Sequence, residues 1–136
     1  MKNKTIKKIA TFAMGIVLAG ATVLTPTTKA MANSRNDSVS GTINGLKCSG
    51  RLVINSREAI AETNYQGGGQ IIAKVTLHVD DEGKDKKLVA EDNKTGGTAY
   101  AVARIDSGIE LTKNASGYHK VKSGAYTWEK YTSVSY

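Results

Sequence analysis

Few side chains in this sequence could act as nucleophiles, bases or metal ligands. Cys48 is the one thiol, and His78 and His119 are the two imidazoles, in a chain of 136 residues. A zinc site takes four ligands at recognisable spacings, which one cysteine and two distant histidines do not supply. A catalytic thiol needs a nearby base and an accessible, electropositive surrounding. We therefore expect no catalytic residue, no metal and no cofactor, and we expect both histidines on the surface.

Cys48 lies in an alternating stretch, on the same parity as Leu46, Leu52 and Ile54. Side chains of one parity share one face of a strand, so this pattern turns the thiol toward the interior. We expect a buried, inert cysteine. An interchain disulfide and a catalytic thiol are the alternatives, and an intrachain disulfide is excluded because no second cysteine exists.

Carboxylates are the remaining groups that could do chemistry. Glu58 and Glu62 can lie on one side of a strand, but paired glycosidase acids need a sizeable cleft that a small domain hardly provides. The run DDEGKDKK at 80–87 gathers four acids, yet it lacks the alternation and the distal glutamate of an EF-hand loop. Its lysines also neutralise it. We expect a solvated hairpin tip at 80–87 and a protein that is not an enzyme.

Aromatic side chains are the one feature that indicates binding. They gather in the last 19 residues of the chain, interleaved with Thr and Ser: Tyr118, Tyr126, Trp128, Tyr131 and Tyr136. Exposed aromatic rings can stack on sugar rings or lie at a membrane interface. The alternative is that some of these rings fill a core that is poor in large side chains. We take the five as a possible binding face.

The N-terminal segment predicts where these side chains act. Four lysines precede an apolar run of 16 residues, Ile9–Leu24, and Pro26 and the small-x-small sequence Ala30-Met31-Ala32 follow. A membrane-spanning helix needs roughly 20 apolar residues, so this run predicts a signal peptide and no stable membrane span. We expect residues 1–32 to be cleaved and the protein to be secreted and extracellular. An uncleaved N-terminal anchor is the alternative.

Removing this leader changes the charge of the chain. The whole sequence carries +7, but five of its 19 basic residues and none of its 12 acids precede position 33. The remaining 14 basic and 12 acidic residues give +2. This weak charge argues against a nucleic-acid partner. About 104 residues remain, which is enough for one domain with a core.

Most of the remaining sequence alternates between apolar and polar residues, as strands with one buried face do. Asn44-Gly45 predicts a tight hairpin turn between strands at 39–43 and 46–54. Residues 71–79 form the clearest strand. At 57–65 a strand is preferred over a short helix, and Gly67–Gly69 is expected to end it. Gly96-Gly97 is expected to form a turn before the strand that carries the second alanine stripe.

Six to nine short strands predict an all-β fold, a small antiparallel β-sandwich or barrel. Two alanine stripes, at 59–61 and 99–103, would let another layer approach closely. We expect a flexible N-terminal arm at 33–38 and a single β-sandwich domain at 39–136.

The segments TINGLKCSGRLVI and HKVKSGAYTWEKYTSVSY, with the alanine-alternating strands between them, resemble small secreted proteins of Gram-positive bacteria that have no assigned activity. The Gly/Tyr/Thr-rich texture and aromatic C-terminus are also similar to lactococcin-type bacteriocins. That resemblance implies an exported β-sandwich without disulfides, and it carries over no functional residue.

The function that we expect is that of a secreted, non-enzymatic β-sandwich that binds at or near a bacterial cell surface, for instance cell-wall polysaccharide or another surface component. The alternative is a bacteriocin-like antibacterial protein. The oligomeric state does not follow from the sequence.

Overall fold

The computed structural model describes residues 34–106 and 111–136. The predicted signal peptide, its cleavage site after Ala32 and the first residue of the predicted arm lie outside this part of the chain. The described residues form six strands and no helix, so the prediction of an all-β fold is confirmed. No helix that is long and apolar enough to cross a membrane occurs among them.

All the strand pairs are antiparallel, and β3 is the centre of the sheet. The sheet order is β1-β2-β3-β5-β6, and β4 pairs with β3 along almost its whole length. The strands are β1 (Arg35–Ile43), β2 (Leu46–Ile54), β3 (Glu58–Asp81), β4 (Lys84–Arg104), β5 (Leu111–Ser123) and β6 (Tyr126–Ser135).

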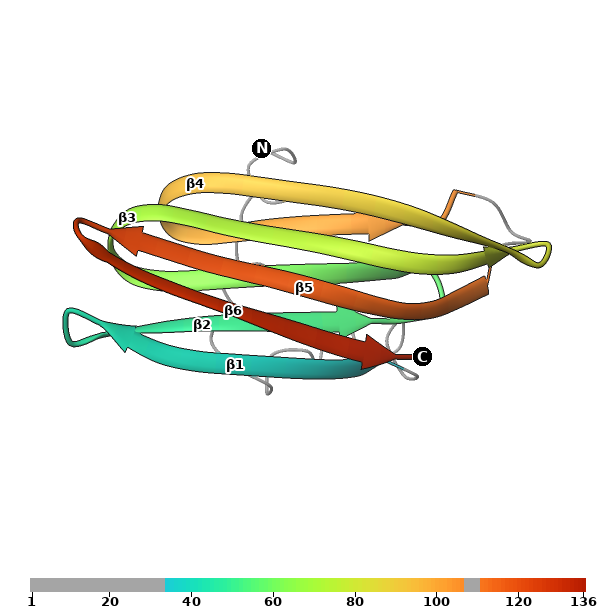
Figure 1. Cartoon of the computed structure of the whole chain (residues 1–136), viewed down its shortest axis with the longest axis horizontal. Helices are drawn as coiled ribbons and strands as arrows, with labels where there is room; N and C mark the ends of the chain where they lie inside the picture. The colour runs from blue at the N-terminus through green and yellow to red at the C-terminus, as the bar shows by residue number, and fades with distance from the viewer. Residues whose placement is uncertain (1–33, 107–110) are drawn as a thin grey trace, which may run out of the picture. The chain divides into compact units, whose positions relative to one another are not determined.

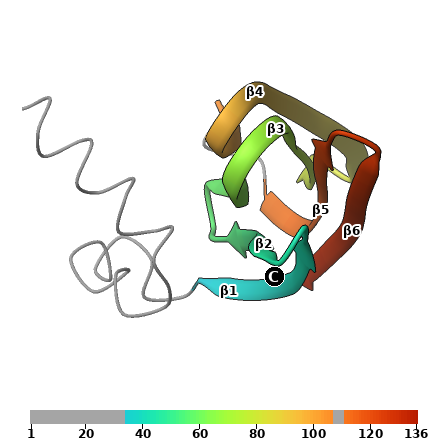
Figure 2. The same ribbon diagram turned by 90° about the vertical axis from the view of Figure 1, so that its left-hand side faces the viewer.

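The long β3–β4 hairpin bends and so belongs to two layers. Its half at 58–65 and 97–104 joins β1 and β2 in what we call the first layer. Its half at 70–81 and 84–95 joins β5 and β6 in the second layer. Figure 1 shows β5 and β6 in front of the first layer, and Figure 2 shows the layers curling around a common interior. The described residues thus form a sandwich that is nearly closed like a barrel.

Glycines make these bends possible, and here the structure corrects two strand ends. We expected Gly67–Gly69 to end one strand and Gly96-Gly97 to be a turn, but β3 and β4 continue through both sites. The β3 register shifts between Tyr65 and Gln70, and Gly69 has a φ of 149°. A Cβ atom at Gly69 would lie 2.4 Å from the carbonyl oxygen of Lys122. Only glycine allows β5 to pass so closely.

The turns follow the expected chemistry, with one difference. Asn44 and Gly45 both have positive φ, 51° and 73°, as a tight two-residue hairpin turn requires. The charged stretch 80–87 is a hairpin tip, but it is mostly strand. Glu82 and Gly83 alone form its turn, and Asp80–Asp81 pairs with Lys84–Asp85. The charged side chains here therefore extend into water from paired strands rather than from a loop.

The interior contains most of the side chains that the alternation assigned to it, although Leu46, at the start of β2, is exposed. Cys48 and the alanines of both stripes are buried, and Ala59 and Ala61 pair across strands with Ala103 and Ala101. Small side chains at these paired positions leave room for the facing layer. The segment that could have been a short helix is strand, because β2 and β4 pair with it on both sides.

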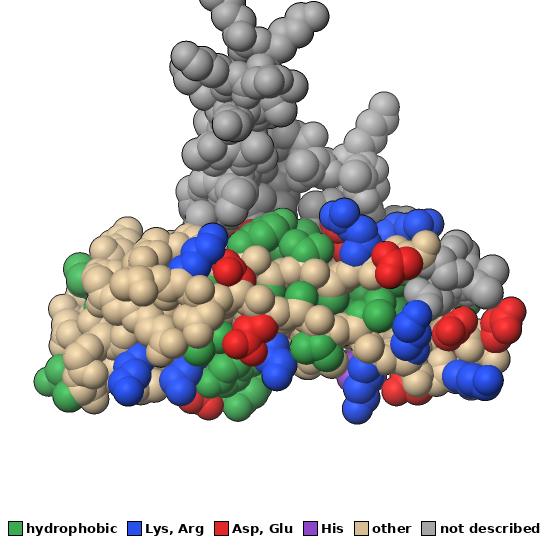
Figure 3. All heavy atoms as spheres, turned by 90° about the horizontal axis from the view of Figure 1, so that it is seen from above, with side chains coloured by type: hydrophobic (Ala, Val, Ile, Leu, Met, Phe, Trp, Pro, Cys, Tyr) green, Lys and Arg blue, Asp and Glu red, His purple; other side chains and the backbone are tan. Residues whose placement is uncertain are grey.

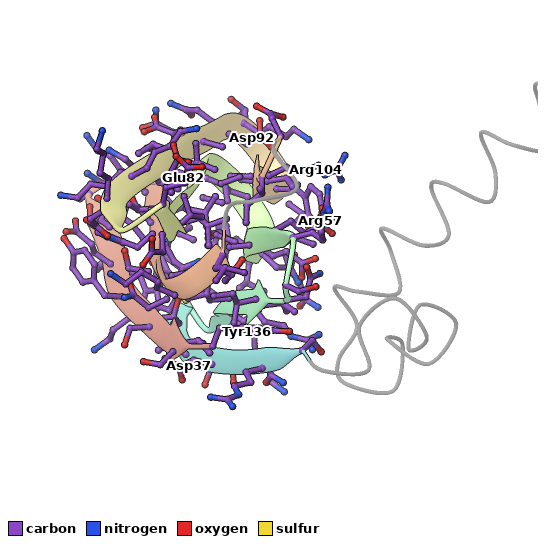
Figure 4. The ribbon with its side chains drawn as sticks, turned by 90° about the vertical axis from the view of Figure 1, so that its right-hand side faces the viewer. Asp37, Arg57, Glu82, Asp92, Arg104 and Tyr136 are labelled. Carbon is purple, nitrogen blue, oxygen red and sulfur yellow. The ribbon has the colours of Figure 1, made fainter. Side chains whose placement is uncertain are left out.

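The sheet ends at β1 and β6, which side chains join at a seam. Asp37 accepts a hydrogen bond from the Ser133 amide (3.0 Å), and Arg35 donates to the Ser135 carbonyl (3.1 Å). Figure 4 labels Asp37 and Tyr136 at this seam. Residues 35–38, which we expected in a flexible arm, therefore belong to β1, because β2 pairs with all of them and β6 lies beside them.

Candidate functional site

The outward side of the second layer brings four side chains into one row across four strands. Glu91 on β4 pairs with Lys74 on β3, Lys74 pairs with Tyr118 on β5, and Tyr118 pairs with Tyr131 on β6. Residues paired in this way lie on one face, within reach of one another. Two of the five aromatic residues predicted as a binding face therefore meet.

Tyr118 and Tyr131 border an open depression, which we call the tyrosine dish. Their ring centroids are 5.2 Å apart, with an angle of 45° between the ring planes. The depression has a volume of about 360 Å³, and small residues line it together with the rings. Its lining is Lys74, Thr76, Glu91, Ser116, Gly117, Tyr118 and Tyr131.

Charged side chains lie beside the two tyrosines of the dish. The Tyr131 hydroxyl donates to the Glu129 carboxylate over 3.3 Å, and Lys120 pairs with the same carboxylate at 4.0 Å. Burial, followed by a hydrogen bond to Glu129 and the charges of Glu129 and Glu91, raises the pKa of Tyr118 to about 12. Tyr118 is therefore a neutral phenol over the whole physiological range and can both donate and accept.

The other three aromatic residues lie elsewhere. Trp128 points inward and is 8 % exposed, so it is part of the core, the alternative that the sequence left open. Tyr126 and Tyr136 are both exposed, but Tyr126 is the first residue of β6 and Tyr136 follows its last residue, Ser135, so they lie at opposite ends of the strand. The five residues thus separate into a pair at the dish, one core residue and two distant surface residues.

His119 is buried, which corrects the prediction of two surface histidines. It is fully inaccessible, and its Nδ1 lies 2.9 Å from the Thr63 hydroxyl of the first layer. Its Nε2 lies 2.8 Å from the Thr132 hydroxyl of the second layer. The ring faces Gly50, where a Cβ atom would lie 2.3 Å from the ring Cγ. His119 thus fits because β2 has no side chain at this point.

Burial is the main reason that the pKa of His119 falls to about 4, opposed by a backbone hydrogen bond at Glu62 and the charge of Asp37. The ring is therefore neutral near pH 7, with one nitrogen donating and the other accepting. His78 is on the outward side of β3, as expected, 3.4 Å from the Asp85 carboxylate. Neither imidazole lines the tyrosine dish.

Glu58 and Glu62 share the outward side of the first layer, as the sequence allowed. Glu58 forms an ion pair with Arg104 at 2.7 Å. Glu62 is 3 % exposed, pairs across strands with Arg51 and Tyr100, and has a pKa raised to about 7 by burial, against the charge of Arg51. Glu58 is thus paired with an arginine and Glu62 is buried, and the tyrosine dish lies on the other layer.

The remaining chemical candidates are also placed. Cys48 is buried, and its burial raises the pKa of the thiol, so it has little thiolate character. In the described ranges, no three His, Cys, Asp or Glu side chains are grouped as metal ligands. The acids at 80–87 lie at the β3–β4 turn, where Asp80 accepts a hydrogen bond from the Gly83 amide.

The sequence did not indicate the small hydroxyl residues that line the dish. Thr76 and Ser116 come from separate segments that only the β3–β5 pairing brings together, and neither residue type stands out in the sequence. The pairing of Tyr118 with Tyr131 had a signal, because a two-residue turn at Gly124-Ala125 fixes that register.

Comparison with protein-family models finds no match to this chain. Comparison with curated proteins finds no match either.

Proposed function

We propose that this chain is a secreted, non-enzymatic protein that binds cell-wall polysaccharide at a bacterial surface through the tyrosine dish. The observation that carries the proposal is the contact of Tyr118 with Tyr131 beside a depression of about 360 Å³. This volume is at the low end of the range for small-molecule sites, roughly 300–1,000 Å³. A short unit of a polymer could occupy it while the rest of the polymer continues over the open rim.

The lining suits a sugar. Aromatic rings offer an apolar face on which the C–H side of a sugar ring can pack, and their hydroxyls reach water or a ligand. Lys74 and Glu91 supply a donor and an acceptor for sugar hydroxyls in the lining of the dish, and Ser116 supplies a hydroxyl there. Tyr131 is 68 % exposed, so a ligand that covers it removes apolar surface from water.

Binding to purified insoluble cell-wall polysaccharide tests the proposal. Each of Tyr118→Ala and Tyr131→Ala is expected to weaken binding about tenfold, or about 1.4 kcal/mol, because each removes one wall of the dish. Tyr136→Ala is the matched control, since it removes an exposed tyrosine away from the dish and leaves the affinity unchanged. No retention on any wall polysaccharide, or equal affinities for all the variants, would contradict the proposal.

A further inference from the structure

Three turns lie together at one end of the sandwich, which we call the turn end. They are the β1–β2 turn at Asn44-Gly45, the β3 bend at Gly67–Gly69 and the β5–β6 turn at Gly124-Ala125. Figure 1 shows them at the left, and Figure 2 looks directly at this end. The β3–β4 turn at Glu82-Gly83 is at the other end of the molecule.

Side-chain hydrogen bonds join these turns to one another. The Tyr65 hydroxyl donates to the Ile43 carbonyl (3.4 Å), beside the β1–β2 turn. The Ser123 hydroxyl, next to the β5–β6 turn, donates to the Gly68 carbonyl (2.8 Å). The turn end is therefore one connected surface rather than three separate loops.

Two apolar side chains project at this end. Leu46 is 39 % exposed and Tyr126 is 60 % exposed. Leu46 is on the same side of β2 as the buried Cys48, and Tyr126 is on the same side of β6 as the buried Trp128. Both therefore lie on the inward side of their strands, just beyond the end of the core. An apolar residue at such a position has no neighbouring layer to pack against and meets solvent or a partner.

The charges at the turn end have one sign. Lys47 and Lys122 are exposed there, next to Leu46 and near Tyr126 in sequence. The segments that build this end, 41–50, 63–70, 93–98 and 120–128, contain no Asp or Glu. The nearest acids along the chain, Glu62, Asp92 and Glu129, lie one residue beyond them. The opposite end holds four acids in the stretch 80–85. In Figure 3 no acidic side chain is visible at the left tip of this face, and acidic and basic side chains are mixed over the rest of it.

We propose that the turn end docks on an anionic lipid surface. Leu46 and Tyr126 would enter the boundary between head groups and acyl chains, where amphipathic tyrosine rings are favoured. Lys47 and Lys122 extend from opposite layers of the sandwich, and each can reach a lipid phosphate beside the inserted pair. The tyrosine dish lies on the side of the second layer, so docking by the end leaves it open to polysaccharide.

A fluorescent side chain at the turn end tests this proposal, in the protein as it is purified from the cells that express it. Tyr126→Trp places an indole at the turn end, while the buried Trp128 gives a constant background. With phosphatidylglycerol vesicles the emission is expected to shift to shorter wavelength, and with pure phosphatidylcholine vesicles it is not. Leu111→Trp is the control, since Leu111 is 68 % exposed and pairs with Asp80 near the opposite end.

Charge and apolar variants then separate the parts of the surface. In the Tyr126→Trp background, Lys47→Glu with Lys122→Glu is expected to abolish the shift, and Leu46→Ser to reduce it. Lys84→Glu with Lys87→Glu makes the same charge change at the opposite end and should leave the shift intact, as should Tyr118→Ala, which tests the dish alone.

Three outcomes would overturn lipid docking. They are no shift with anionic vesicles, an equal shift with both vesicle types, or a shift that survives the Lys47→Glu, Lys122→Glu pair. A shift that appears without vesicles as protein concentration rises would instead assign the turn end to a second copy of the chain, and would also overturn the proposal. Circular dichroism of each variant verifies that the fold is retained.

Discussion

Glycines that face rings explain how this small core holds its polar and aromatic side chains. The His119 ring faces Gly50, and the Trp128 ring faces Gly41, where a Cβ atom would lie 2.4 Å from the indole Nε1. Each ring comes from the second layer and each glycine from the first. A ring that enters a glycine gap brings the two layers closer than two side chains would.

The buried imidazole makes stability depend on pH. The pKa of His119 falls from 6.5 to about 4 in the folded protein, so the unfolded chain takes up the proton first as the pH drops. The stability that His119 contributes is therefore fully present above pH 6.5 and is lost as the pH falls toward 4, by at most about 3 kcal/mol. Glu62, whose pKa is raised to about 7, acts in the opposite sense, because here the folded chain takes up the proton first. Urea unfolding of the wild type and of His119→Gln between pH 7 and pH 4 measures the His119 contribution as the difference between them.

Two glutamine variants identify the group responsible. His119→Gln should lose less stability than the wild type between pH 6.5 and 4, whatever its stability at pH 7, since the titrating ring is gone. His78→Gln is the matched control for the substitution, because it replaces the other imidazole, which lies on the outward side of β3. A slope that is the same in His119→Gln and in the wild type would show that other groups cause the acid sensitivity.

Gly50 is predicted to be intolerant of a methyl group. Gly50→Ala would place its Cβ atom against the His119 ring, and overpacking of this kind costs about 1–3 kcal/mol. Gly68→Ala is the matched control, because no atom lies within 4 Å of its Cβ position, and it should change stability by less than about 0.5 kcal/mol. Equal unfolding midpoints for the two variants would refute the close fit.

The position of His119 in the alternating pattern predicted its burial better than its residue type did. His119 lies in a polar segment, which led to a surface prediction, yet it has the parity of Val121 and Ala115, and this parity is correct. What the sequence could not show was the glycine in β2 that makes room for the ring. That space depends on the stacking of two layers, which no local pattern encodes.

Edge strands carry backbone amides that no neighbouring strand pairs with. On two edges of this sheet a carboxylate accepts a hydrogen bond from such an amide. Asp37 of β1 accepts from the Ser133 amide of β6 (3.0 Å), and Asp92 of β4 accepts from the Tyr100 amide of the same strand (2.8 Å). An uncovered edge amide is open to water or to a strand of another molecule. These two contacts thus protect the sheet where its ladder ends.

Removing either carboxylate should expose only its own amide. Asp37→Ala is expected to speed hydrogen exchange at Ser133 by up to about tenfold, because a charge-assisted bond to a partly exposed amide contributes on the order of 1 kcal/mol. Asp92→Ala should do the same at Tyr100 and leave Ser133 unchanged. Exchange measured by NMR decides this. Unchanged rates at both amides would mean that neither carboxylate protects its edge.

The sequence predicted the faces of the strands better than their lengths. Alternation identified the inward side of β2, β3 and β4, including Cys48 and both alanine stripes. It did not show that β3 and β4 pass through their glycine runs. A glycine pair with positive φ can form a tight turn that ends a strand, or it can bend a strand that continues, as Gly96 and Gly97 do. The partner strand on the far side of the bend decides which occurs.

For the molecule as a whole, the shared hairpin predicts cooperative unfolding. The two layers contain different halves of β3 and β4, so neither layer can separate without breaking strands of the other. Trp128 fluorescence reports on the second layer, and far-UV circular dichroism reports on the whole sheet. Their urea transitions should coincide. A fluorescence midpoint well below the dichroism midpoint would show that the second layer unfolds alone.

The candidate site could be predicted only in part from the sequence. The aromatic tail drew attention to Tyr118 and Tyr131, and the β5–β6 turn places them opposite each other. Lys74 joins them through the β3–β5 pairing between residues far apart in sequence. Trp128 and Tyr136 could not be separated from the site by pattern alone, because Trp128 belongs to the core and Tyr136 lies beyond the end of β6.

Binding of polysaccharide in the tyrosine dish can be measured by NMR. Soluble cell-wall oligosaccharides are titrated into isotope-labelled protein while the backbone amide shifts are followed. We predict saturable shifts concentrated at Lys74, Thr76, Ser116 to Tyr118 and Tyr131, with no change at the β3–β4 turn. Shifts confined to other surfaces, or none at the highest ligand concentration, would contradict it.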